Sequence, residues 1–269
     1  MILADADQPE MRIARPSVQC IEIAGADART FAQAQFSGDV RALQAGRWQW
    51  NAWLDAKGGV RALMHLADPG DGRLVALLRG GDAHTFCATL QRFVLRAKVS
   101  LDALDGLQPI AGSALPLGQL AIEDDALGFG HGDRSLWLKR GDAANGRGDG
   151  DLRLADIRDG WPTLPPGDHV FLPPALGLEH LGAVSFAKGC YPGQEIAARL
   201  HYRGGHKLRL GHVRATFPLA AGEPVSPDQP RAIVLDTVMA HQGCEALAVL
   251  DENAGELHAG IEIVRRFEA

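Results

Sequence analysis

Cys190 is the residue whose sequence context most strongly suggests chemistry. It lies in the segment Lys-Gly-Cys-Tyr-Pro-Gly-Gln-Glu at 188–195, where Gly189 and Gly193 permit a tight backbone path. Because residues 194–200 favour a helix, we expect Cys190 in a turn that leads into a helix N-terminus. Free N–H groups and the positive end of the helix dipole favour a thiolate there. The same residues also fit an inert, half-buried cysteine, and the local pattern leaves both interpretations open.

Residues around Cys190 offer donors for a polar or anionic ligand. Lys188, Tyr191 and Gln194 carry side chains able to hold an anion or a polar ring. After Glu195 the next acidic residue is Glu223. The positive and titratable residues between them are Arg199, His201, Arg203, His206, Lys207, Arg209, His212 and Arg214. This basic segment fits either a solvated strand face or a surface that attracts anions.

Four tryptophans in two places are candidates for stacking on a flat ligand. Trp48 and Trp50 fall on one face of an alternating strand, and Trp53 falls on the other face. Alternating aromatic residues are mostly core residues, so Trp53, which faces away from the other two, is the better candidate for a ligand contact. Trp161, in a turn, is a comparable candidate.

Composition excludes several classes of protein. The formal net charge of −6 argues against a protein that coats nucleic acid. No run of roughly twenty apolar residues is present to cross a membrane, and the polar start of the sequence does not resemble a signal peptide. We therefore expect a cytoplasmic protein. The cysteines form no CxxC pair and the histidines no HExxH motif, so we expect no metal site and no disulfide framework.

Alternating and helical patterns predict an α+β chain that ends in short strands. A helix is expected to begin at Asp82, with one buried face that includes Phe86, Leu90 and Phe93. Residues 140–151 are expected to form an exposed loop. The expected strands are 17–23, 48–54, 60–66, 73–78, 208–216, 232–239, 246–250 and 258–264, and the last four suggest a small barrel.

The segment 188–195 resembles the signature octapeptide of the YgfZ family, whose members are folate-binding relatives of the glycine-cleavage T protein. Weaker matches to the family follow one another along the chain, at 25–27, 33–40, 55–58, 156–162, 178–186 and 203–207. Arg158 stands near the place where T proteins carry an acidic residue that binds the pterin. The resemblance covers most of the chain.

The resemblance implies an α+β fold like that of the T protein, with two intertwined α+β domains and a C-terminal small β-barrel around a central channel. The folate-binding region would be 1–202, composed of approximately 1–50 with 150–202 as one subdomain and 51–149 as the other. The barrel would be 203–269. Tetrahydrofolate would bind in the channel.

The resemblance also implies a role in the assembly or repair of iron–sulfur proteins, including tRNA-modifying enzymes. Iron–sulfur proteins or their assembly factors would be the partners. Cys190 would be the functional thiol, with Lys188 beside it as a second catalytic candidate. Folate-binding candidates are Tyr191, Gly193, Gln194, Glu195, Arg199, Arg203, Lys207, Trp53 and Trp161.

Two other functions stay open. A folate-dependent one-carbon transferase needs a carboxylate placed to handle the folate nitrogens, and no acidic pair in the sequence stands out for that task. An RNA-binding module would use the basic segment on phosphate, although the net charge of −6 disfavours it. The same cations would alternatively attract the glutamate tail of a folate.

Overall fold

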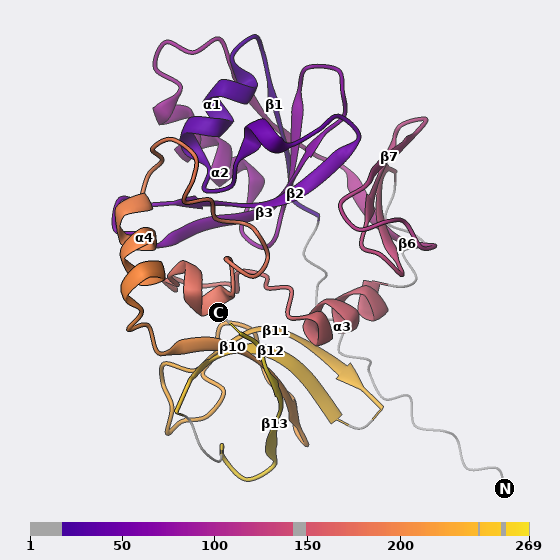
Figure 1. Ribbon diagram of the computed structural model, residues 1–269. Helices are drawn as coiled ribbons and strands as arrows, with labels where there is room; N and C mark the ends of the chain where they lie inside the picture. Colours follow the sequence, from indigo (N-terminus) through magenta and orange to yellow (C-terminus); the bar gives the residue numbers. More distant parts are fainter. Residues whose placement is uncertain (1–17, 142–148, 242, 254–256, 269) are drawn as a thin grey trace, which may run out of the picture.

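The computed structural model describes residues 18–141, 149–241, 243–253 and 257–268, which form three antiparallel sheets joined by short helices (Figure 1). Sheet A has the strand order β2-β3-β4-β1-β5, sheet B has β6-β9-β8-β7, and sheet C has β11-β12-β10-β13. The 3₁₀ turns that matter below are η2 (Gln91–Phe93) and η4 (Pro173–Leu176).

The bounds of the elements follow the chain. The helices are α1 (Ala28–Gln35), α2 (Ala83–Leu90), α3 (Asp149–Asp159) and α4 (Gln194–Arg203). The strands of sheet A are β1 (Cys20–Ala24), β2 (Arg47–Leu54), β3 (Val60–Asp68), β4 (Leu74–Leu78) and β5 (Ser100–Leu104). Sheet B holds β6 (Leu107–Gly112), β7 (Leu120–Glu123), β8 (Ala126–Gly130) and β9 (Ser135–Arg140). Sheet C holds β10 (Leu208–Ala215), β11 (Ile233–Ala240), β12 (Gly243–Asp251) and β13 (Ile261–Arg266).

Sheet A separates two cores, as the alternation along β2 predicts. Trp48 and Trp50 belong to the core that sheet A shares with sheets B and C, together with Phe129. Trp53 belongs to the other core, where α1 and α2 cover the opposite face of the sheet. The pleat of one strand thus sends neighbouring tryptophans into different environments.

Two predicted elements differ from the structure. The helix that begins at Asp82 ends at Leu90, and the tighter turn η2 then rotates Phe93 outward, where it is 45% exposed. Most of the loop predicted for 140–151 lies outside the described residues, but residues 149–151 begin α3. α3 lies between sheets B and C in Figure 1.

The predicted C-terminal barrel is not closed in the part of the chain that the structure describes. β11 and β13 are the two edges of an open four-stranded sheet. The predicted boundary between the two subdomains, at about residue 50, falls within β2, and sheet A contains strands from both sides of it. The division of the chain into intertwined domains stays a prediction.

Candidate functional site

Cys190 is exposed in a bend just before α4, where the sequence predicts it. Gly193 is the N-cap of α4 and has a left-handed backbone (φ 76°). A Cβ at Gly193 would lie 2.5 Å from the carbonyl oxygen of Asp55, so this position excludes any larger residue. The loop that carries the thiol is therefore pressed against the turn between β2 and β3.

Lys188 ties the same loop to the end of α1. Its Nζ donates hydrogen bonds to the carbonyl oxygens of Gln33 (2.6 Å), Phe36 (2.5 Å) and Gly38 (2.9 Å). The ammonium also lies 5.1 Å from the ring centroid of Tyr191. Burial lowers the pKa of Lys188 to about 8, so the amine is still protonated at neutral pH. All three N–H donors are occupied, and these contacts support an anchor rather than the predicted catalytic role.

Replacing Lys188 with methionine is expected to loosen this loop. Lys188→Met leaves three partly buried carbonyls without their donor, which is expected to lower the free energy of unfolding by about 2 kcal/mol. Urea unfolding measures this, and the rate of Cys190 alkylation is expected to rise. The matched control is Lys57→Met, at an exposed turn position. Equal stability of the Lys188→Met and Lys57→Met variants would contradict an anchoring role.

The other predicted ligand-binding residues do not meet in one place. Tyr191 is buried, and burial raises the pKa of its phenol to about 12. The side-chain amide of Gln194 donates to the carbonyl of Lys188, at 3.5 Å. The outward-facing members of the set are Glu195, Arg199, Arg203 and Lys207, on α4 and just after it.

The two tryptophan candidates lie on opposite sides of sheet A. Trp53 is buried and packs edge-on against Phe86 (5.5 Å between ring centroids) and Phe93 (5.6 Å). Trp161 is half-buried and packs edge-on against Trp50 (5.6 Å) and His131 (4.8 Å). One flat ligand cannot contact both, so at most one of these predictions describes a ligand-stacking residue.

A central cavity of about 190 Å³ lies where the three sheets meet. Its walls come from β4, β6, β9, α3 and β11, from the residues just before β1, and from His131 after β8. Its apolar lining includes Val18, Leu77, Leu136 and Leu152, and its polar lining includes Gln19, Arg79, His131, Arg153, Asp156, Thr163 and Asp236. Among the described residues, Cys190 is not part of this wall.

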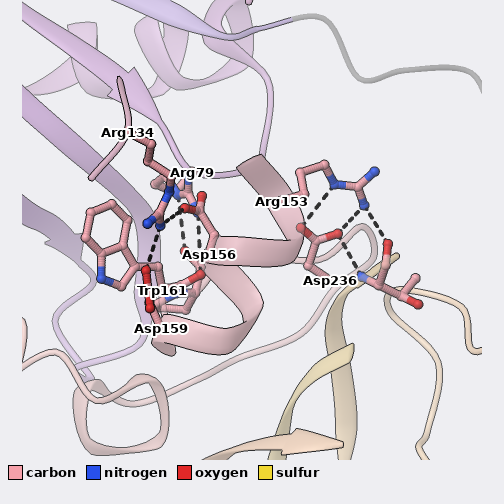
Figure 2. A network of polar contacts seen from close by, with 9 residues as sticks. Arg79, Arg134, Arg153, Asp156, Asp159, Trp161 and Asp236 are labelled. Carbon is pink, nitrogen blue, oxygen red and sulfur yellow. Dashed lines mark hydrogen bonds and ion pairs between the residues drawn. The ribbon is translucent and has the colours of Figure 1, made fainter. Parts of the chain in front are cut away.

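Arginine–carboxylate pairs organise the polar wall of the central cavity, as Figure 2 shows. Asp156 of α3 forms an ion pair with Arg79, just after β4 (2.8 Å), and accepts a hydrogen bond from Arg134 of the β8–β9 turn (2.9 Å). Arg134 also reaches Asp159 (2.7 Å), and its guanidinium lies over Trp161, 5.2 Å from the ring centroid. The cavity thus places a buried carboxylate between two guanidinium groups.

A second pair is formed one turn earlier on α3. Figure 2 shows Arg153 paired with Asp236 of β11. Arg153 also donates to the carbonyl of Thr237 (2.9 Å). Sequence reasoning missed these residues because no local motif marks them. Arg79 and Asp156, for example, lie far apart in the chain and meet only through the fold.

Arg158, expected near the pterin contact of T proteins, points elsewhere. Its guanidinium makes two hydrogen bonds to Glu245 of β12 (2.6 and 3.0 Å), and Glu245 also contacts His212 (2.9 Å). Arg158 therefore joins α3 to sheet C. The acid that α3 does present to the central cavity is Asp156.

Two buried histidines belong to an aromatic cluster beside the central cavity, and one of them, His131, lines the cavity itself. The ring of His65 stacks on Trp48 (4.1 Å between centroids) and lies 5.5 Å from the ring of His131. None of their four ring nitrogens has a hydrogen-bond partner among the described residues. Burial lowers the pKa of His131 to about 4, and burial with the charge of Arg79 lowers the pKa of His65 well below its usual value.

Acid is expected to destabilise the protein through these histidines. An unfolded histidine binds a proton near pH 6.5, whereas folded His131 does so only near pH 4, so the unfolded state holds more protons in between. The free energy of unfolding should fall as pH drops through this window, by roughly 3 kcal/mol for His131. Urea unfolding at several pH values should show a smaller fall in His131→Phe than in the wild type, and no such change in the exposed control His84→Phe. An identical pH dependence in wild type and His131→Phe would refute this assignment.

Known proteins share the fold and part of the sequence of this chain. No family model matches the chain. Among solved structures, aminomethyltransferase T of the glycine cleavage system from Bartonella henselae has a TM-score of 0.63 and 16% identity, covering 87% of this chain and 76% of that chain. The protein therefore has the fold of the glycine-cleavage T protein. The described residues contain no helix long and apolar enough to span a membrane.

Sequence relatives define the family more narrowly. A protein of Haemophilus influenzae described as uncharacterized is 32% identical over 201 residues, which cover 71% of this chain and 69% of the relative. The "tRNA-modifying protein YgfZ" of Edwardsiella ictaluri is 30% identical over 233 residues, which cover 73% of this chain and 68% of the relative. The chain belongs to the YgfZ family, which confirms the resemblance read from the octapeptide.

Proposed function

We propose that this chain is a cytoplasmic tetrahydrofolate-binding protein that supports the assembly or repair of iron–sulfur proteins, including tRNA-modifying enzymes. Cys190 is its functional thiol. The observation that carries the proposal is the placement of this thiol: it is exposed at the start of α4, in a loop anchored by Lys188 and Gly193. A cysteine that is both exposed and held in a constrained loop fits a functional thiol better than an inert one.

The central cavity is the proposed site for the ring system of the folate. Asp156 and Asp236 offer carboxylate oxygens to ring N–H and amino groups, while Leu77 and Leu136 offer apolar surface to the ring faces. At about 190 Å³ the cavity is smaller than most sites for whole ligands, so the aminobenzoate and glutamate tail would lie outside it. Bound folate would supply a carrier for one-carbon units.

The predicted tail contacts of Arg199, Arg203 and Lys207 have less support. None of these residues is part of the central cavity wall, and α4 lies at the outer edge of the molecule in Figure 1. Their attraction for an anionic tail stays a prediction.

Tetrahydrofolate binding tests the cavity assignment. Thr163 lines the cavity and is not part of the arginine network. Thr163→Phe should fill the space and weaken tetrahydrofolate binding by about tenfold or more, a loss of about 1.4 kcal/mol. Isothermal titration calorimetry measures this, with the exposed substitution Val170→Phe as control. Unchanged binding in a folded Thr163→Phe variant would exclude the central cavity.

Substitution of the thiol tests the proposed role in cells. Cys190→Ser should abolish the support of iron–sulfur enzyme activity in cells that lack the native copy, because serine has no comparable nucleophile. Thermal stability and folate binding should stay near wild type, since the side chain is exposed. The control is Cys87→Ser, at a half-buried position on α2. Full activity of the Cys190→Ser variant would remove the thiol from the mechanism.

A folate-dependent one-carbon transferase is the second candidate. Asp156 and Asp236 both line the central cavity, which supplies the acidic pair that the sequence did not reveal. Both carboxylates are already paired with arginines, so their oxygens are engaged by guanidinium groups rather than free to handle the folate nitrogens. Turnover of an aminomethyl donor with tetrahydrofolate would establish the transferase activity. An RNA-binding module has no support beyond the basic segment.

A further inference from the structure

A second and larger cavity lies on the other face of sheet A, beneath α2. This α2 groove has a volume of about 770 Å³, within the range of sites that hold organic ligands or inserted side chains. Its apolar wall consists of Trp53, Leu54, Ala56, Ala62, Leu78, Phe86, Phe93 and Pro192. Pro192 belongs to the same loop as Cys190, so an occupant of the groove contacts the loop that carries the thiol.

The acids at the edge of the α2 groove already have partners. The Asp82 carboxylate accepts from the backbone N–H of Thr85 (2.7 Å) and caps α2. Asp55 accepts from the N–H groups of Lys57 (2.8 Å) and Gly59 (2.9 Å), and it pairs with Arg61 (3.3 Å). The carboxylates at the rim of the groove are therefore already engaged by groups of the fold itself.

Positive charge and apolar surface continue outward from the groove along residues 91–98, the cationic strip. Phe93 is 45% exposed and Leu95 is 91% exposed. Arg92 precedes these two residues and Arg96 and Lys98 follow them, all three are exposed, and the strip contains no acidic residue. An exposed apolar surface that extends past a cavity indicates a protein partner rather than a small molecule.

We propose that the α2 groove and the cationic strip bind an acidic segment of a partner protein, which inserts an aromatic or leucine side chain into the groove. Opposite charges fix the orientation of the segment, and the apolar contact supplies most of the affinity. An RNA strand fits less well, because most of the groove wall is apolar, whereas RNA binding depends mainly on contacts between cations and successive phosphates. This site extends the proposed function by a partner surface and does not require folate to bind.

Selection from a displayed random-peptide library tests the proposal on the full chain. The library is selected on the wild type and counter-selected on Thr85→Trp, which places a large side chain in the groove from the exposed face of α2. Synthetic copies of the enriched peptides are then titrated against the wild type and three variants. Arg92→Glu reverses the charge of the strip, Thr85→Trp blocks the groove, and Arg140→Glu is a matched charge reversal on sheet B.

The expected peptides combine Asp or Glu with Trp, Phe or Leu. They should bind the wild type and Arg140→Glu alike, and lose about tenfold or more in affinity for Thr85→Trp and Arg92→Glu. No enrichment, peptides without acids, or equal binding to folded Thr85→Trp would overturn the proposal. So would binding of a short RNA that is lost in Thr85→Trp and falls steeply with salt. Tetrahydrofolate titration of the same variants separates this outcome from a failure of the central cavity assignment.

Discussion

The attachment of the 183–193 segment to the end of α1 and the turn after it is the constraint on which the position of the thiol depends. Three separate contacts make this attachment. Ser37 Oγ donates to the carbonyl of Ala183 (2.7 Å), and the N–H of Ser185 donates to the carbonyl of Ser37 (2.8 Å). The Lys188 ammonium donates to the carbonyl of Phe36 at the end of α1. A half-buried ammonium is costly unless carbonyls surround it, so the charge holds the loop in one place. Cys190 is mobile only to the extent that these bonds allow.

α3 plays the corresponding role for the three sheets. Through Asp156 it contacts Arg79 at the end of β4 and Arg134 near sheet B, and through Arg153 and Arg158 it contacts sheet C. Buried ion pairs add little net stability compared with well-packed apolar groups, but removing one partner is expensive. The network therefore fixes the relative position of the sheets more than it stabilises them. The central cavity is the space that these paired charges leave between the sheets.

The sequence predicts the features that depend on local pattern. The alternation of Trp50 and Trp53 gives the two faces of β2, and the glycines around Cys190 give the bend before α4. Features that depend on distant partners were not predictable. α3 has no apolar stripe and begins among glycines and aspartates, so its sequence does not indicate a helix. The sequence presents Lys188 as a free donor, because its carbonyl partner in α1 is distant in the chain.

The separation of the thiol from the central cavity has a chemical consequence. A nucleophile reacts with a bound group only when the two atoms come within about 3.5 Å of each other. Among the described residues Cys190 does not line the central cavity, whereas Pro192 in the same loop borders the α2 groove on the other face of sheet A. A folate ring in the central cavity is therefore not presented to this thiol. The arrangement favours a thiol that acts on a group carried by a docked partner over one that receives a one-carbon unit from folate, and this favours an accessory protein over a transferase.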